Sequence, residues 1–192
     1  MTLRVQSGSA RGRRLKAVPG GREVRPILAR IRKSLFDILR PRIEGALFLD
    51  LFAGTGMVGI EALSNGAARA TFVDRASSSL RMIETNVAFL GFAERSEVLR
   101  ADVARDLRAL AGRRFDLIFL GPPYKDEKAV PLALSVPALS RVAEAGLAGP
   151  ETWVVLQHHD KESLDGAEAR WEKFREKEYG DTTLSFFKLR AL

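Results

Sequence analysis

A glycine-rich turn between a predicted strand and a predicted helix holds the first residues that could do chemistry. Residues 54–59 read Gly-Thr-Gly-Met-Val-Gly, after an apolar run at 46–52. Glycines in such a turn let the backbone approach a ligand closely and leave the N-terminus of the next helix open to it. Asp74 ends the following strand, at about the separation expected of an acid that binds ribose hydroxyls. On these features alone, a nicotinamide dinucleotide and S-adenosylmethionine are both possible ligands.

Three further features favour S-adenosylmethionine. Asp50, four residues before Gly54, places a carboxylate that would repel a pyrophosphate but attract the cationic end of a methionine moiety. Asp102 ends the third strand, where it can accept a hydrogen bond from an adenine amine, and the fourth strand ends in a Gly-Pro-Pro-Tyr turn that has no role in hydride transfer. The alternative is that the three acids are only helix caps. We expect a cofactor site formed by Asp50, Phe52, Ala53, Gly54, Thr55, Gly56, Asp74, Arg75, Asp102 and Val103.

Composition and length exclude several other classes of protein. The chain has 192 residues, enough for one substantial core, and no cysteine, which excludes disulfides, cysteine-zinc sites and thiol nucleophiles. The first residues lack the apolar stretch of a secretory signal, and no apolar run approaches the length of a membrane span. We therefore expect a cytoplasmic monomer that needs neither a membrane nor a metal.

Positive charge is concentrated at the N-terminus. Residues 1–45 contain twelve Lys/Arg and three acids, whereas the remainder contains 19 basic and 21 acidic residues. Such asymmetry is typical of a protein that binds a polyanion with one end, because cations placed at phosphates release counterions; the alternative is an arginine-rich solvated surface. The predicted RNA contacts are Arg11, Arg13, Arg14, Arg25 and Arg30.

The chain is predicted to contain an N-terminal arm at 1–45 and a cofactor-binding domain at 46–192. Short strand-like pieces at 3–5 and 15–18 indicate a hairpin, and Pro26 opens an amphipathic helix with Arg30, Arg32 and Lys33 mainly off its apolar stripe. Beyond residue 46, strands alternate with helices, and the last part (171–192) forms two strands around Gly180. This pattern predicts an α/β, Rossmann-like fold, with a mostly parallel seven-stranded sheet and an antiparallel last strand.

These motifs together resemble the bacterial 16S ribosomal RNA guanine-N2 methyltransferases of the RsmD type. The resemblance runs nearly end to end. It is carried by Ser7-Gly8, the basic run at 11–15, Arg25-Pro26, residues 30–32 with Leu35-Phe36, the loop at 50–56, residues 59–63, Asn86, Phe115-Asp116, Pro122-Pro123-Tyr124 and Tyr179-Gly180-Asp181-Thr182. It implies the fold of class I methyltransferases, S-adenosylmethionine as cofactor, and 16S ribosomal RNA or the assembling small subunit as partner.

The resemblance also implies that Gly121, Pro122, Pro123 and Tyr124 form the catalytic turn. In this family the turn is Asp-Pro-Pro-Tyr or a close variant. An acceptor side chain and a backbone carbonyl hold the exocyclic amine, and the aromatic ring stacks on an unstacked base. Two alternatives are a cofactor-binding RNA-binding or assembly protein without catalysis, and a nicotinamide oxidoreductase.

This chain departs from the family pattern at the acceptor itself, because position 121 is glycine. Asp126 could turn inward as a substitute, although it more readily starts the following helix. Ile27, Ala29 and Lys33 also replace Thr, Asp and Glu of the family pattern. We predict slow methyl transfer, and faster transfer after the substitution Gly121→Asp.

Overall fold

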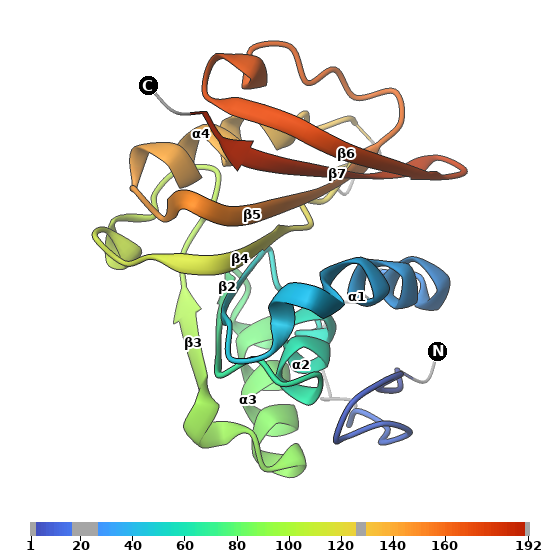
Figure 1. Cartoon of the computed structure of the whole chain (residues 1–192). Helices are drawn as coiled ribbons and strands as arrows, with labels where there is room; N and C mark the ends of the chain where they lie inside the picture. The colour runs from blue at the N-terminus through green and yellow to red at the C-terminus, as the bar shows by residue number, and fades with distance from the viewer. Residues whose placement is uncertain (1–2, 17–26, 126–129, 191–192) are drawn as a thin grey trace. The chain divides into compact units, whose positions relative to one another are not determined.

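The computed structural model describes residues 3–16, 27–125 and 130–190. The chain divides into two compact units, Met1–Arg100 and Ala101–Leu192, which are described separately below. The predicted boundary between residues 45 and 46 separates functions, and a division by compactness does not test it. Figure 1 gives the element labels.

The first unit is built on three parallel strands, β1 (Leu47–Leu51), β2 (Arg69–Asp74) and β3 (Ser96–Arg100), in the order β3-β2-β1. Helices α2 (Met57–Ser64) and α3 (Ser77–Leu90) connect these strands and pack against them, and the 3-10 turn η1 (Ala93–Arg95) precedes β3. All eight residues of α2 are buried. Its apolar residues are buried as expected of a helix covered on several sides, and its two buried polar residues, Glu61 and Ser64, are hydrogen-bonded to the N-terminal segment.

Helix α1 (Ala29–Ile43) and the N-terminal arm complete this unit. The predicted stripe is confirmed, since Ile31, Leu35, Ile38 and Leu39 are buried, but the helix begins at Ala29. Pro26, where we predicted its start, lies outside the described residues. The hairpin is confirmed by the antiparallel bridge between Arg4 and Arg14 and its flanking backbone hydrogen bonds. Figure 1 shows the arm, in dark blue, beside α2.

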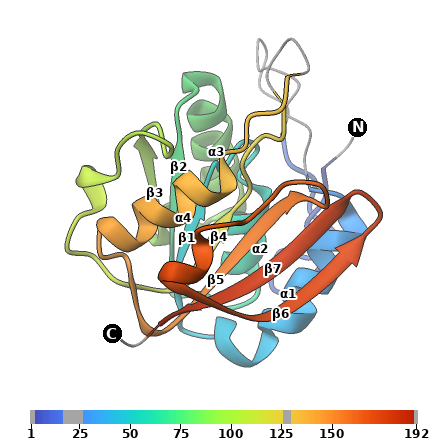
Figure 2. The ribbon, with the colours of Figure 1, turned by 90° about the horizontal axis from the view of Figure 1, so that it is seen from above.

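The second unit contains β4 (Phe115–Leu120), β5 (Ala148–His159), β6 (Trp171–Tyr179) and β7 (Thr182–Leu189), with α4 (Ser135–Glu144) packed against β5. The 3-10 turns η2 (Arg108–Leu110) and η3 (Ala167–Ala169) lie in its connections. Strand β4 pairs parallel with β5, and β7 lies between β5 and β6, antiparallel to both. Figure 2 shows β5, β7 and β6 side by side in that order.

The described residues thus contain seven strands in the α/β pattern that the sequence predicts: three parallel strands in the first unit, and four in the second, of which β7 alone is antiparallel to its neighbours. The predicted site residues follow the carboxyl ends of strands: the glycine loop follows β1, Asp74 ends β2, and the Gly-Pro-Pro-Tyr turn follows β4. In open α/β sheets, this is the edge where ligands bind. No helix in the described part of the chain is long and apolar enough to span a membrane.

Candidate functional site

The glycine loop is a tight turn with three residues in the left-handed region of backbone space. Phe52, Gly54 and Gly56 have φ values of 62°, 53° and 71°. The Gly56 N–H donates to the Ala53 carbonyl at 2.7 Å, and Gly56 then precedes the first turn of α2. A Cβ at Gly56 would lie 2.7 Å from Cγ1 of Ile83, so both conformation and space require glycine there. The loop therefore brings bare backbone to the N-terminus of a helix.

Asp74 ties this loop to the next strand end. Its Oδ2 accepts a 2.8 Å hydrogen bond from the Gly54 N–H, and its Oδ1 accepts one of 2.8 Å from the Ala76 N–H. The side chain stays partly exposed, so both oxygens keep lone pairs that can accept hydroxyl donors. The neighbouring Arg75 is exposed. Asp74 thus closes the loop and remains able to bind a ligand.

Asp50 is held under the loop in full burial. It is 1% exposed, and its Oδ2 accepts a 2.9 Å hydrogen bond from the Gly59 N–H in the first turn of α2. Burial raises the pKa of this carboxyl to about 8, against the opposing effect of the Gly59 hydrogen bond; the nearby Asp74 adds to the rise. The hydrogen bond to Gly59 is the contact that a helix-capping acid would make. Asp50 also lies near the end of β1, where we predicted it.

Asp102 and Val103 lie near the start of the second unit, and the prediction that Asp102 ends the third strand was wrong, because β3 already ends at Arg100. Asp102 Oδ1 accepts a 3.2 Å hydrogen bond from the Ala104 N–H, and its Oδ2 lies 3.6 Å from the Arg105 Nε. Val103 is buried. Like Asp50, Asp102 therefore accepts a hydrogen bond from a backbone N–H that follows it in the chain.

The Gly-Pro-Pro-Tyr turn presents a tyrosine that is fixed at both ends. The Tyr124 hydroxyl accepts a 3.0 Å hydrogen bond from Nε2 of Gln157 on β5, and its backbone carbonyl accepts one of 3.1 Å from the Leu132 N–H. Burial raises the pKa of the Tyr124 hydroxyl, so the ring stays neutral. At Gly121 the φ angle suits any residue, and an added Cβ would lie 3.0 Å from Cε1 of Phe119. A side chain at 121 therefore requires only a small shift of that ring.

Two histidines at the end of β5 lie in different environments. His158 is buried, with Nε2 2.9 Å from the Ser185 hydroxyl, and burial lowers its pKa. His159 is half-buried, and its ring lies edge-on to Tyr124, with centroids 5.8 Å apart. The alternation of side chains along a strand, which places neighbours on opposite faces, was the signal that could have separated them.

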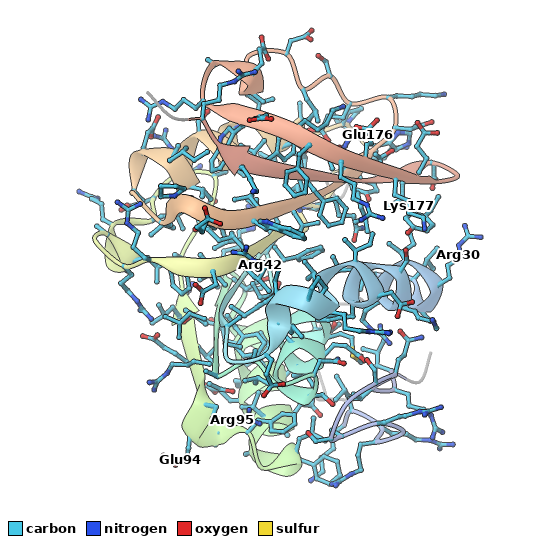
Figure 3. All side chains as sticks on the ribbon, in the orientation of Figure 1. Arg30, Arg42, Glu94, Arg95, Glu176 and Lys177 are labelled. Atoms are coloured by element: carbon cyan, nitrogen blue, oxygen red, sulfur yellow. The ribbon has the colours of Figure 1, made fainter. Side chains whose placement is uncertain are left out.

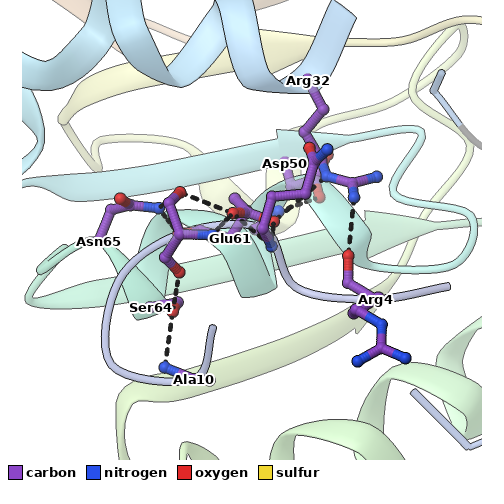
Figure 4. A network of polar contacts seen from close by, with 10 residues as sticks. Arg4, Ala10, Arg32, Asp50, Glu61, Ser64 and Asn65 are labelled. Atoms are coloured by element: carbon purple, nitrogen blue, oxygen red, sulfur yellow. Dashed lines mark hydrogen bonds and ion pairs between the residues drawn. The ribbon is translucent and has the colours of Figure 1, made fainter. Parts of the chain in front are cut away.

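A buried ion pair joins α1 to α2, and the N-terminal arm is hydrogen-bonded to both of its members (Figure 4). The sequence did not predict this ion pair. Arg32, which we placed off the apolar stripe, is 3% exposed, and its Nε lies 3.2 Å from Oε2 of Glu61, itself 1% exposed. Glu61 also accepts hydrogen bonds from the backbone of Gln6 and Ser7, while Nη2 of Arg32 donates to the Arg4 carbonyl. Arg32, although off the apolar stripe, is buried because α2 supplies an acid and the arm supplies a carbonyl on that side of α1.

The cations predicted to contact RNA can be compared with other exposed cations by whether an acid pairs with them. Arg11, Arg13 and Arg14 are exposed, as are Arg4 and Lys16 in the same hairpin, and none of the five forms an ion pair with a described acid. Elsewhere, several exposed cations are paired, for example Arg108 with Asp106. Arg30 extends away from α1 (Figure 3). Arg25 and Asp126 lie outside the described residues. Within the described ranges, no cluster of three or more His, Asp or Glu could hold a metal.

Comparison with known proteins decides the family. The family described as Conserved hypothetical protein 95 matches residues 3–188, which is nearly the whole chain. The chain belongs to this family. The Bacillus subtilis protein YlbH, named for rRNA methyltransferase activity, is 35% identical over 191 residues, covering 98% of this chain and 100% of YlbH. Ribosomal RNA small subunit methyltransferase D of Escherichia coli K12 is 29% identical over 189 residues, covering 98% and 91%. The predicted resemblance to the RsmD type is confirmed.

Solved structures of similar proteins superpose on most or all of the chain. The Escherichia coli methyltransferase yhhF superposes with a TM-score of 0.84 at 29% identity, covering 100% of both chains. The Thermus protein TTHA0928 gives a TM-score of 0.76 at 30% identity, covering 97% of this chain and 99% of that one. An RNA methyltransferase of Salinibacter ruber, solved with S-adenosyl-L-homocysteine, shares the fold at 15% identity, with a TM-score of 0.65 and coverage of 85% and 93%. The predicted methyltransferase fold is confirmed.

Proposed function

We propose that this chain is an S-adenosylmethionine-dependent methyltransferase that acts on the N2 amine of a guanine in small-subunit ribosomal RNA. The observation that carries the proposal is its full-length similarity to bacterial proteins named rRNA methyltransferases. The intact glycine loop, closed on Asp74 at the N-terminus of α2, supports the cofactor assignment. The tyrosine that follows two prolines after β4 supports the choice of a base amine as acceptor.

The residues present fit such a cofactor. In the first unit, the backbone of Ala53 to Gly56 would lie against the methionine end and Asp74 would accept ribose hydroxyls, with Phe52 and Arg75 as further contacts. In the second unit, Asp102 would accept a hydrogen bond from the adenine amine, with Val103 as a further contact. Residues 53–56 all have small side chains or none, and both glycines have left-handed backbone conformations, so no bulky side chain fills this loop. When bound, S-adenosylmethionine supplies a methyl group on a cationic sulfur. The chain's own task is to orient the acceptor and exclude water.

At the acceptor, the turn supplies a stacking ring and backbone carbonyls. Tyr124 would stack on the flipped base, and Gln157 and Leu132 keep its ring in place. The carbonyls of Gly121 and Pro122 would hold amine hydrogens. Since position 121 carries no side chain, one polar group of the family's pattern is missing, and loss of one such group costs about 10²–10³ in rate.

The phosphates of the RNA would be contacted by Arg11, Arg13, Arg14, Arg25 and Arg30. The unpaired state of the three hairpin arginines supports this role, because their charge is not neutralised by neighbouring acids. The partner that fits is 16S ribosomal RNA, free or in the assembling small subunit, bound by a monomer.

Methyl transfer from labelled S-adenosylmethionine to unmethylated small subunits tests the proposal. The chain as given should transfer slowly, and Gly121→Asp should be about 10²-fold faster, because the new carboxylate can hold the amine. Gly121→Ala is the matched control, since it makes the same contact with Phe119 but adds no acceptor. It should leave the rate unchanged or slightly lower.

Two other outcomes identify the rival functions. If neither the chain nor Gly121→Asp transfers methyl groups while S-adenosylhomocysteine and RNA still bind, the protein is a binding or assembly factor. If calorimetry shows tight binding of NAD(H) alone, the glycine loop serves a dinucleotide and the chain is an oxidoreductase. Where methyl transfer is observed, mapping the modified base identifies the nucleotide.

A further inference from the structure

An exposed aromatic side chain lies beside the cations of the N-terminal hairpin (residues 3–16). Phe89, near the end of α3, is 38% exposed. The guanidinium carbon of Arg13 lies 4.8 Å from the centroid of the Phe89 ring, and Nζ of Lys16 lies 4.3 Å from it. Single exposed apolar residues are common on protein surfaces, but two cations over one exposed ring are a specific arrangement. An aromatic surface and two positive charges therefore meet at one place in the first unit.

A buried asparagine on α3 fixes the backbone that carries one of these cations. Asn86 is 0% exposed, and its Oδ1 accepts a 2.7 Å hydrogen bond from the Lys16 N–H. Its Nδ2 donates to the Lys16 carbonyl at 3.1 Å, and Nη2 of Arg13 donates to the Phe89 carbonyl at 3.4 Å. The hairpin is thus held to α3 before any ligand binds. Such preorganisation lowers the entropy that a ligand must lose from the protein on binding.

The charge around Phe89 is positive. Five exposed cations of the hairpin form no ion pair with a described acid, namely Arg4, Arg11, Arg13, Arg14 and Lys16. The acids nearest to Phe89 in sequence are Glu84 and Glu94, and neither adjoins it. An excess of unpaired cations attracts a polyanion, and an aromatic ring among them adds a contact that a phosphate cannot make.

An aromatic surface among unpaired cations is the arrangement that binds single-stranded nucleic acid. The ring stacks on a base while the cations contact phosphates, and a guanidinium plane can stack on a base as well. Bases inside a duplex do not offer their faces, so the segment bound in this way is unpaired. We propose that Phe89, Arg13 and Lys16 bind an unpaired nucleotide of the RNA, with its base stacked at the Phe89 ring. The inference rests on the proposed function, which supplies RNA as the partner.

The test compares RNA with a polyanion that has no bases. Phe89→Leu keeps an apolar side chain but removes the aromatic face. It should weaken binding of a labelled oligouridine of about 12 nucleotides by about tenfold, measured by fluorescence anisotropy. Binding of duplex RNA and of inorganic polyphosphate should stay unchanged. The slope of log affinity against log salt should also stay unchanged, because no charge is lost.

Phe174 on β6 provides the matched control. It is 37% exposed, and Nζ of Lys188 lies 5.8 Å from its ring centroid, but its strand also carries Glu172 and Glu176. Phe174→Leu should therefore leave the affinity for oligouridine unchanged. A second readout follows the site directly: in Phe89→Trp, oligouridine should quench the emission of the new indole, and polyphosphate should not.

Several results would overturn the proposal. These are no measurable binding of oligouridine by the chain as given, an unchanged affinity in Phe89→Leu, or an equal loss for oligouridine, duplex RNA and polyphosphate. The last would mean that the ring only supports the hairpin. No experiment in this set needs the cofactor, so its outcome is separate from methyl transfer. Selective loss of oligouridine binding without methyl transfer by any variant would support the nucleotide site and contradict the proposed function, and methyl transfer with unchanged binding in Phe89→Leu would do the reverse.

Discussion

At the scale of single residues, Asp50 combines two demands that usually exclude each other. A carboxylate is favoured at the N-terminus of a helix, where it accepts free N–H groups, but it loses its hydration when it is buried. Asp50 receives one N–H, from Gly59, and is 1% exposed. One hydrogen bond does not replace the lost water, so the proton stays on at neutral pH, as its pKa of about 8 records.

This shift predicts a decline of stability with rising pH. The folded pKa of Asp50, about 8, is above its ordinary value of 3.8, so the folded state holds the proton more tightly than the unfolded state. The contribution is complete below pH 3.8 and is lost as pH rises toward 8. The substitution Asp50→Asn keeps an acceptor for the Gly59 N–H without a group that titrates. The free energy of unfolding of the wild type, relative to this variant, should fall by about 1 kcal/mol per pH unit within this window.

Urea unfolding at pH 5.5, 6.5 and 7.5 measures this difference. His158 acts in the opposite direction, since its lowered pKa makes stability rise with pH below its ordinary value, but it is present in both proteins and cancels. Asp165→Asn, at an exposed acid between β5 and η3, is the control for a change of charge alone. A wild type and Asp50→Asn that keep a constant difference across the three pH values would contradict the assigned pKa.

At the scale of elements, α2 joins the cofactor loop to the N-terminal arm. Its first turn carries the Gly59 N–H that bonds Asp50, and its second half carries Glu61 and Ser64, which receive the arm. The arm approaches so closely that a Cβ at Gly8 would lie 1.8 Å from the Ser64 carbonyl oxygen. Gly8 also has a φ of 75°, so only glycine satisfies both conditions. The arm is thus a docked part of the first unit.

Substitution of Glu61 tests how firmly this element is held. Glu61→Gln leaves the buried Arg32 without its anion, and loss of one partner of a buried pair costs about 3–5 kcal/mol. Urea denaturation should show this loss, and trypsin should cleave the arm faster. Glu84→Gln, an exposed acid on α3, should change neither. Because the penalty arises from the remaining charge, Arg32→Met combined with Glu61→Gln should recover part of it; a double variant no more stable than Glu61→Gln would refute this account.

Much of this architecture could be predicted from the sequence. Alternation of apolar strands with helical stripes predicted the fold, because burial on both faces of a parallel sheet leaves a local signature. The burial of Arg32 and of His158 could not be predicted for one reason: each has a buried partner distant in sequence, Glu61 and Ser185, which no local periodicity reports. The glycine loop was predictable because its function demands small residues in succession, whereas the His159–Tyr124 contact depends on the pairing of strands.

At the scale of the whole molecule, segments differ in how many cations they contain and in whether those cations are paired with acids. The net charge is +7, and the excess lies in residues 1–45. In the described part of the chain, exposed cations outside the hairpin often have an acid within reach, as Lys33 and Arg40 have Asp37. The hairpin cations have none, and two of them, Arg13 and Lys16, lie over the exposed ring of Phe89. An unneutralised surface of this kind raises the local concentration of a polyanion.

The salt dependence of RNA binding separates these two populations of cations. Each phosphate contact that is lost should lower the slope of log affinity against log salt by about 0.7–0.9. Replacing Arg11, Arg13 and Arg14 together by Gln should therefore reduce the slope by about 2, measured by fluorescence anisotropy on a small-subunit rRNA fragment. Replacing Arg108, Arg141 and Lys173 by Gln removes the same charge from cations that are already paired, and should leave the slope nearly unchanged. Equal reductions in both triple variants would mean that net charge alone attracts the RNA and that the arm is no dedicated contact surface.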